Sequence, residues 1–347
     1  MDLFKMIQEH QRLVEENSVS MSEEKNSPIE VTIKNGQFDT SKIVEYKGEK
    51  SKKFDFRPTK WDEFIGQTEA KNRAKTIIKK KERGLKSHFL VDGIKGHGKT
   101  TFVQLLAKDM DAHIIKRIGK QIDVDNLVNI INEINACEKD NIVFFVDEID
   151  TMDKKVIKTL NPIIESFEIA NKNIKHFIFA GATINKHILL ENNPDTLDRI
   201  ATHIKFARYN SQEISQIINQ YIKQLYSEDN ITSNIIEIIS KNCKFNPRTA
   251  IGLLEEYVVE KNIENVLRNC HIVKDGLTVI DMNILKVLNQ SARPMGANSL
   301  AMKVKLNQNE YIKEFEPYLI EYDYINRVPS RVISEKGKVV LDEICNS

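Results

Sequence analysis

The pattern of hydrophobic and polar positions changes along the chain and predicts different elements in different regions. Short continuous apolar runs predict buried strands at residues 88–92, 141–146 and 176–180, where "HFLVD", "NIVFFV" and "HFIFA" leave no polar face. The runs "HIIKRI" and "HIKF" predict flanking strands. Because helical patterns separate these runs, residues 54–208 are expected to form a parallel α/β sheet covered by helices on both faces.

After this region the spacing becomes helical. Residues 209–275 are expected to form a small all-helical unit, in which "NPRTAIGLLEEYVV" opens with a proline at a helix start. Residues 276–347 predict short helices, followed by a strand, a tight turn and a second strand in "YINRVPSRVISEKGK". The pattern therefore predicts two further domains after the sheet.

Residues 1–53 have a different character. "LFKMIQEHQRLVEE" has helical spacing, and "IEVTIKNGQFDT" alternates before Asn35-Gly36, which is a strong hairpin signal. The rest of this segment is polar. It is expected to be an appended docking arm or a partly disordered leader.

Composition excludes little. The 347 residues carry 51 Lys+Arg and 50 Asp+Glu, so the net charge of +1 neither requires nor rules out a nucleic acid partner. No apolar run approaches the roughly 18 residues that a membrane span needs, and no signal-peptide layout is present. The 4 cysteines show no C-x-x-C spacing. We expect reduced, mostly buried thiols in a cytoplasmic protein.

The stretch "GIKGHGKT", residues 93–100, fits the phosphate-loop template G-x-x-x-x-G-K-[ST] between a predicted strand and a predicted helix. Glycines let successive N–H groups turn toward phosphates, and the helix N-terminus adds positive potential. Lys99 is expected to reach the terminal phosphates and the Thr100 hydroxyl to bind Mg²⁺. The side chains of Lys95 and His97 are expected to be exposed to solvent. The candidate nucleotide contacts in this loop are Gly93, Gly96, His97, Gly98, Lys99, Thr100 and Thr101.

The stretch "NIVFFVDEID" places two carboxylates after a buried strand. A carboxylate is costly at such a position unless it serves a cation, so Asp147 is expected to hold Mg²⁺ directly or through water. Glu148 suits a base that orients an attacking water, which favours hydrolysis.

Through these motifs and several others, the chain resembles the AAA+ ATPases, and among them the RuvB-type branch-migration motors. The matching runs span residues 54 to about 344: "FRPTKWDEFIGQ", "GIKGHGKTT", "VDEID", "GATI", "TLDRI", "NPRTA" and "EPYLIEYDYINRVPSR". The resemblance implies an AAA+ core at 54–208, a helical lid at 209–275 and a winged helix at 276–347.

The resemblance also implies residue roles and ATP as the nucleotide. Thr183 matches the sensor of the γ-phosphate, Arg199 the arginine finger that reaches a neighbouring subunit's nucleotide, and Arg248 the second sensor on the lid. The positions that hold adenine in this family are Arg57, Pro58 and Ile65. For each arginine the alternative is a surface salt bridge.

The winged helix implies DNA binding without sequence specificity, with Arg327 and Arg331 near the turn of the wing. Residues 276–347 hold 9 Lys+Arg against 9 Asp+Glu, so only a local basic patch at the wing supports this expectation. Docking of a protein partner by the winged helix is the alternative. On the helix that follows "FIGQ", a run of basic residues is expected to be a solvated face.

The chain departs from the family in two ways. RuvB-type motors carry a β-hairpin that docks the partner protein RuvA, but only residues 170–175 connect the helix at 162–169 to the next strand, too few for that hairpin. Residues 1–53 are additional and could recruit another protein. The leading interpretation is a ring, expected to be a hexamer, that hydrolyses Mg-ATP to move or remodel DNA. The alternative is a nucleotide-dependent assembly switch that regulates a partner without moving along DNA.

Overall fold

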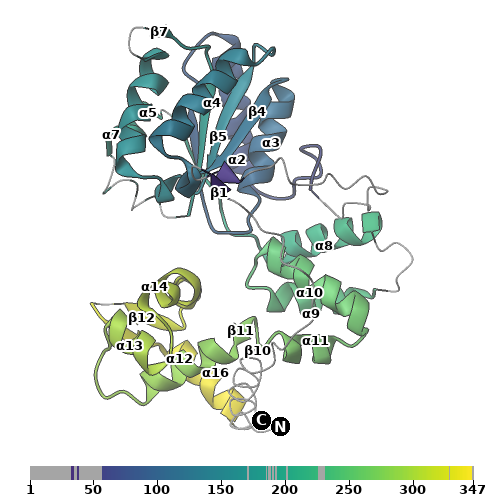
Figure 1. The fold of residues 1–347 in the computed structure, drawn as a ribbon. Helices are drawn as coiled ribbons and strands as arrows, with labels where there is room; N and C mark the ends of the chain where they lie inside the picture. Colours follow the sequence, from purple (N-terminus) through teal and green to yellow (C-terminus); the bar gives the residue numbers. More distant parts are fainter. Residues whose placement is uncertain are drawn as a thin grey trace. The chain divides into compact units, whose positions relative to one another are not determined.

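A computed structural model shows the architecture of the chain (Figure 1). It describes residues 33–34, 37–38 and 57–345, except for short gaps at 170–171, 185, 187–188, 190, 192–193, 201, 226–230 and 328. Among the described residues, none of the helices has both the length and the apolar character needed to cross a membrane. Residues Phe56–Leu277 form one compact unit, and the C-terminal residues from Thr278 belong to a second.

The central sheet is parallel and five-stranded, in the order β4-β5-β8-β3-β9. All five strands that the apolar runs predicted are present, with ends shifted by a few residues. Their bounds are β3 Phe89–Asp92, β4 His113–Ile118, β5 Ile142–Asp147, β8 Ile178–Thr183 and β9 Thr202–Lys205. The strand order places β5 and β8 in the interior of the sheet, where both of their faces are covered.

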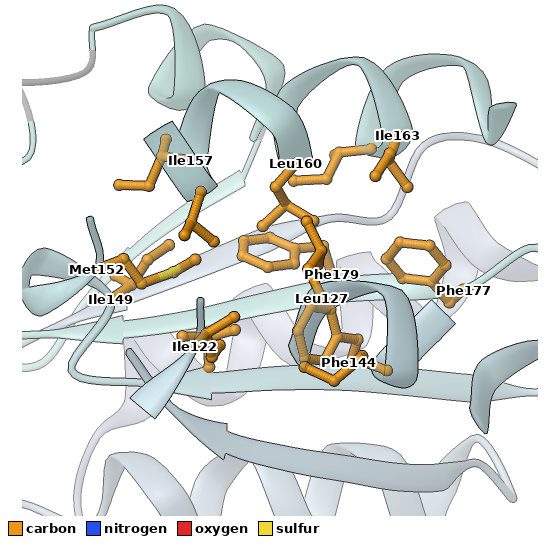
Figure 2. Close-up of a cluster of buried hydrophobic side chains, with 14 of the residues drawn as sticks. Ile122, Leu127, Phe144, Ile149, Met152, Ile157, Leu160, Ile163, Phe177 and Phe179 are labelled. Atoms are coloured by element: carbon orange, nitrogen blue, oxygen red, sulfur yellow. The ribbon is translucent and has the colours of Figure 1, made fainter. Parts of the chain in front are cut away.

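Helices cover both faces of this sheet (Figure 1). On one face α2 (Thr68–Glu82) and α3 (Lys99–Asp109) pack through Ala74, Phe102 and Leu106 against apolar side chains of β3 and β5. On the other face lie α4 (Val124–Ala136) and α5 (Lys154–Ser166). Figure 2 shows this second core, in which Ile157 and Leu160 of α5 lie over Phe179. Two separate cores therefore hold the carboxyl ends of the strands in place.

The segment after α5 differs from the prediction. The helix ends at Ser166, and β6 (Glu168–Ile169) then pairs antiparallel with β7 (Lys172–Asn173). The expectation that the connection is too short for a hairpin is therefore wrong: a hairpin is present, with strands of 2 residues each. The left-handed conformation of Phe167 (φ 56°) ends the helix early and allows this turn.

Four helices follow β9, as the helical spacing predicted. Two of them begin at residues suited to a helix start. Asn246 caps α10, whose first turn also holds Pro247, and Asn262 caps α11. Their apolar faces meet in a small core that includes Ile214, Ile239 and Leu254. Their bounds are α8 Ser211–Leu225, α9 Ser233–Asn242, α10 Pro247–Glu260 and α11 Ile263–Asn269. A two-stranded ladder of β10 (Ile272–Lys274) and β11 (Leu277–Thr278) comes next.

The C-terminal unit contains short helices and a two-stranded wing. In the wing, β12 (Ile325–Arg327) pairs antiparallel with β13 (Arg331–Ile333), and Met295 bridges to Arg331. The sequence missed the last helix, because the stretch predicted as the second wing strand becomes helical from Glu335. The helices are α12 Val279–Asn289, α13 Ala297–Lys303, α14 Gln308–Glu310 with a π-helical turn at Tyr311–Phe315, α15 Glu316–Glu321 and α16 Glu335–Cys345.

Within residues 1–53 the structure describes only the ladder around Asn35-Gly36. There β1 (Ile33–Lys34) pairs antiparallel with β2 (Gln37–Phe38), which confirms the predicted hairpin. The predicted leading helix lies outside the described residues.

The cysteines that the structure describes are free thiols, as expected. Cys243 is buried, and burial raises its pKa to about 11, whereas Cys137 and Cys270 are half-buried.

Candidate nucleotide site

The phosphate loop joins β3 to the N-terminus of α3. Gly98 stands immediately before the helix with a φ of 89°, and Gly96 has a φ of 85°. An L-residue rarely adopts these angles, so glycine is required at both positions. Close packing adds a second constraint, because a Cβ on Gly98 would lie 3.0 Å from the ring of Phe64. The loop is therefore fixed by backbone geometry before any ligand arrives.

Lys99 is folded back over this loop. Its ammonium donates hydrogen bonds to the carbonyl oxygens of Gly93, at 2.6 Å, and Ile94, at 3.0 Å. The side chain is buried, and burial lowers the pKa of Lys99 from its ordinary value. A buried ammonium that has only carbonyl dipoles as direct partners is well prepared to exchange them for phosphate oxygens.

The end of β5 places Asp147 beside the start of α3. The Thr100 hydroxyl donates to Asp147 Oδ2 at 3.1 Å, which brings together the two predicted metal ligands. The ammonium of Lys116, on β4, lies 3.3 Å from the same oxygen. A hydroxyl and a carboxylate are hard oxygen ligands of the kind that Mg²⁺ prefers, and a cation already rests on the carboxylate. The residues present therefore fit Mg²⁺.

Glu148 follows in the left-handed conformation, with a φ of 53°. This strained angle turns the chain sharply after the strand, and the Glu148 carbonyl accepts hydrogen bonds from the N–H and hydroxyl of Thr151. The side chain of Glu148 is exposed, unlike its neighbours in the strand. The turn thus presents the carboxylate at the open edge of the sheet.

Thr183 ends β8 next to the phosphate loop. Thr183 lies opposite Asp92 in the pairing of β8 with β3, and the Thr183 carbonyl accepts the N–H of Gly93 at 3.2 Å. The Thr183 hydroxyl donates to Asp150 Oδ1 at 2.6 Å. Burial raises the pKa of Asp92. The structure therefore places the predicted sensor in the site and links it to an acidic residue of "VDEID".

His97 is not exposed as predicted. It is 1% exposed, and its ring packs on Tyr209 with centroids 5.5 Å apart. Its Nε2 is buried with no hydrogen-bond partner, and burial lowers the pKa of His97 to about 4. The imidazole is therefore neutral and acts as an apolar support under the loop.

The lid contacts the loop through Asn246 and Arg248. Asn246 donates to the Lys95 carbonyl at 2.9 Å, and a Cβ on Gly96 would lie 3.1 Å from the Arg248 Cβ. The charge of Arg248 also contributes to the lowered pKa of Lys99, after burial. The predicted second sensor thus lies beside the phosphate loop.

Arg199 is the last residue of α7 (Pro194–Arg199). Its Nε donates to Glu165 Oε2 at 3.0 Å and its guanidinium to the Asp195 carbonyl at 2.9 Å. Its side chain is 31% exposed. Within one chain Arg199 therefore makes a surface salt bridge, which was the alternative to the arginine-finger role. The pairing with Glu165 holds the guanidinium at the surface.

The adenine candidates lie in the segment that leads to the loop. Arg57 is exposed, while Pro58 and Ile65 are half-buried. Gln67 fixes this segment with hydrogen bonds to the carbonyl and N–H of Ala207, at 2.7 and 2.9 Å. Their role toward adenine stays a prediction. Thr101 is buried within α3.

The predicted DNA contact of Arg331 needs a correction. Arg331 is 7% exposed and its guanidinium binds Glu316, which is itself buried, so it is part of the core of the winged helix. This hydrogen bonding raises the pKa of Arg331. Arg327, in contrast, has a side chain that is 56% exposed. Of the two predicted arginines, Arg327 is the one exposed to a ligand, although its guanidinium also lies 3.8 Å from Glu316.

Sequence reasoning missed three residues of the site. Lys116 and Asn246 act through contacts between elements far apart in the chain, which a linear pattern does not show. Asp150 was visible in "VDEID", where a third acidic residue follows the pair that was singled out.

Two family models match parts of the chain. The family model described as the Holliday junction DNA helicase RuvB P-loop domain matches residues 56–193, and the RuvB C-terminal winged helix domain matches residues 274–342.

Two curated relatives carry the same name. "Holliday junction branch migration complex subunit RuvB" of Ureaplasma urealyticum is 31% identical over 309 residues, which covers 82% of this chain and 95% of the relative. The same-named subunit of Mycoplasma genitalium is 27% identical and covers 82% of this chain and 97% of the relative. The solved Thermotoga maritima RuvB Holliday junction branch migration motor superposes with a TM-score of 0.71 at 26% identity, covering 82% of this chain and 98% of that structure.

Proposed function

Because the chain belongs to the RuvB family of AAA+ Holliday junction branch-migration motors, we propose that it hydrolyses Mg-ATP in a ring assembly, and that each turnover moves branched DNA. The observation that carries the proposal is the joining of the phosphate loop to the acidic strand end, where Thr100 and Asp147 share a hydrogen bond. A P-loop protein without hydrolysis would not need the exposed carboxylate of Glu148 beside this pair.

Lys99 and the loop N–H groups hold the phosphates. The Lys99 ammonium donates to the Gly93 and Ile94 carbonyls, and phosphate oxygens are stronger acceptors that would replace them. Thr100 and Asp147 would hold Mg²⁺, which would neutralise charge on the phosphates. Glu148 accepts the proton of the attacking water, because its left-handed turn keeps the carboxylate free of the strand.

The two sensors report on the nucleotide from opposite sides. Thr183 lies at the strand end and Arg248 on the lid helix that touches the loop. Loss of the terminal phosphate changes the partners of both, so the lid responds to hydrolysis.

Arg199 acts on the nucleotide of a neighbouring subunit. The ion pair with Glu165 holds its side chain against α5, where it stays 31% exposed. A finger supplied by the next subunit makes hydrolysis depend on assembly, and a closed ring, which we propose to be a hexamer, gives every subunit such a neighbour.

The winged helix binds DNA through phosphate contacts. Arg327 is the predicted wing residue that remains exposed, while the buried ion pair of Arg331 with Glu316 supports the wing from inside. Contacts of this kind carry no sequence information, which suits a motor that passes over any sequence.

The partner protein is proposed to differ from that of a typical relative. The β6–β7 hairpin has strands of 2 residues, so it presents little surface to a RuvA-type partner. The additional residues 1–53, with the hairpin around Asn35-Gly36, are proposed to recruit another protein.

Measurement of ATP turnover with no DNA, linear duplex and a four-way junction tests the function. We expect the junction to give the largest stimulation, and strand exchange on a labelled junction to require ATP. Turnover that responds to a protein partner but to no DNA would replace the motor by the assembly switch. Absence of ATP binding would reject both.

A further inference from the structure

Lys116 is a cation that the family motifs do not include, and it lies in the metal site. Its Nζ is 3.3 Å from Asp147 Oδ2, the oxygen that also accepts the Thr100 hydroxyl at 3.1 Å. Lys116 therefore touches the same atom that the proposed Mg²⁺ site uses.

The sheet directs this side chain. Strand β4 lies parallel to β5 with Lys116 opposite Phe145, and Phe145 stands two residues before Asp147 on the same face of the strand. The Lys116 ammonium lies 5.6 Å from the centre of the Phe145 ring, so its aliphatic stem runs along the strand toward the carboxylate. The contact follows from strand register and is not an accident of a flexible surface chain.

The neighbouring charges explain why a cation rests there. Asp92, Asp147 and Asp150 gather at the strand ends, and all three carboxylates act on the Lys99 ammonium. Lys99, however, donates its hydrogen bonds to loop carbonyls and not to Asp147. Of the two lysines, Lys116 is the one that neutralises Asp147 by direct contact.

We propose that Lys116 is a built-in counter-cation that occupies Asp147 until Mg²⁺ arrives with the nucleotide, and so sets the Mg²⁺ concentration at which the site loads. The inference rests on the proposed function, since it concerns the same nucleotide site. An ammonium and Mg²⁺ cannot share one carboxylate oxygen without strong repulsion, so the lysine must move away. Its side chain is 43% exposed and Asp147 25% exposed, which leaves it a path into water.

The size of the effect follows from the type of ion pair. Partly exposed pairs of this kind contribute modestly, so removing the lysine lowers the half-saturating Mg²⁺ concentration by about two- to fivefold. Removal leaves binding without Mg²⁺ unchanged, because Lys116 does not contact the phosphate loop.

The test measures binding and requires no turnover. A fluorescent ADP analogue is titrated onto the full chain, with and without Mg²⁺ at constant ionic strength, for the wild type and for Lys116→Met. Lys116→Arg keeps a cation and should stay close to the wild type. Arg117→Met is the matched control, because it removes a cation from the next position of β4 that pairs with Glu133. Arg117→Met should leave the Mg²⁺ titration unchanged.

Three results would overturn the inference. One is an equal Mg²⁺ requirement in Lys116→Met and wild type, and another is an equal shift in Arg117→Met. The third is weaker ADP binding by Lys116→Met without Mg²⁺, which would make Lys116 a phosphate ligand. If Lys116→Met loses its folded circular dichroism signal, Lys116→Gln gives the same comparison with a polar side chain. A wild-type chain that binds no ADP analogue would instead reject the proposed function.

Discussion

Asn246 joins the lid to the phosphate loop by donating a hydrogen bond from its side-chain amide to the carbonyl of Lys95 at 2.9 Å. The oxygen of the same amide accepts the N–H of Arg248 at 3.0 Å and so caps helix α10. One side chain therefore connects the loop that holds phosphate to the helix that carries the second sensor. Any movement of the loop is transmitted to the start of α10.

Replacing Asn246 with Ala should remove both the cap of helix α10 and the contact between the lid and the phosphate loop. Loss of the cap should lower the free energy of unfolding by about 1 kcal/mol, and loss of the bond to Lys95 should weaken ADP binding by roughly fivefold. Trp61, the one tryptophan of the chain, reports unfolding of this unit by fluorescence.

Asn262→Ala is the matched control for that change. Asn262 caps α11 by accepting from the N–H of Asn265 at 3.0 Å and belongs to a helix outside the loop contacts. It should lose a similar amount of stability and retain ADP affinity. Equal losses of affinity in both variants would show that Asn246 acts only as a cap.

Mixing two inactive variants tests whether Arg199 acts between subunits. Lys99→Ala should fail to bind ATP but keep its finger, and Arg199→Ala should bind ATP but lack the finger. Each alone should fall at least about 10²-fold in turnover, because the transition-state charge needs both cations. A mixture should recover part of the activity, measured as phosphate release. No recovery at any ratio would place Arg199 in its own site.

The two wing arginines should behave oppositely. Arg331→Met removes the buried partner of Glu316 and leaves that carboxylate with the Tyr311 hydroxyl at 3.2 Å and the more distant Arg327 guanidinium at 3.8 Å. It should therefore destabilise the winged helix by about 3 kcal/mol. Arg327→Met removes a partly exposed ion pair with Glu316 at 3.8 Å, so it should lower stability by less than about 1 kcal/mol, and it should reduce the salt slope of DNA binding by about 1. Hydrogen exchange of the wing amides and DNA titrations at several salt concentrations distinguish these outcomes. Adding Glu316→Leu to Arg331→Met should restore protection of the wing.

Two buried histidines should make stability depend on pH. Burial lowers the pKa of His88 and of His97 to about 4, from 6.5 for an exposed histidine. Between these values the unfolded chain binds protons that the folded chain does not, so stability falls as the pH decreases from 6.5 to 4. His88 also accepts the Phe179 N–H at 2.9 Å on Nδ1, and protonation would break that bond.

His97→Leu isolates one of the two contributions. At pH 5 the neutral His97 costs roughly 2 kcal/mol relative to pH 7.5, and leucine removes this cost. Denaturant unfolding followed by Trp61 fluorescence at both pH values measures it. A pH dependence identical to that of the wild type would show that the pKa of His97 does not differ between the folded and the unfolded chain.

The parts of the fold that were predictable follow local rules. The continuous apolar runs predicted the strands, because a strand buried on both faces has no polar positions. The stretch "GIKGHGKT" predicted the phosphate loop, because its backbone angles require glycine. Asp147 was found from its place after a buried strand. Each of these patterns is contained in a few neighbouring residues, so it can be recognised without knowledge of the tertiary structure.

The parts that were missed depend on contacts between distant segments. Nothing next to His97 in the sequence shows that Tyr209 covers it, and nothing next to Arg331 shows the carboxylate of Glu316. The hairpin after α5 was missed because two-residue strands carry no periodicity. In each case tertiary packing decided the environment of the residue.

The pairing of Arg331 with Glu316 has a consequence for how this winged helix can change over generations. Replacing either partner alone leaves a charge stranded in the core, while an apolar pair of similar volume is tolerated. A lineage that loses one of these residues must therefore acquire a compensating substitution at the other before the stability of the winged helix is restored. The two positions are expected to vary together among descendants. Arg327, whose guanidinium also lies 3.8 Å from Glu316, is expected to be constrained less strongly because its side chain is 56% exposed.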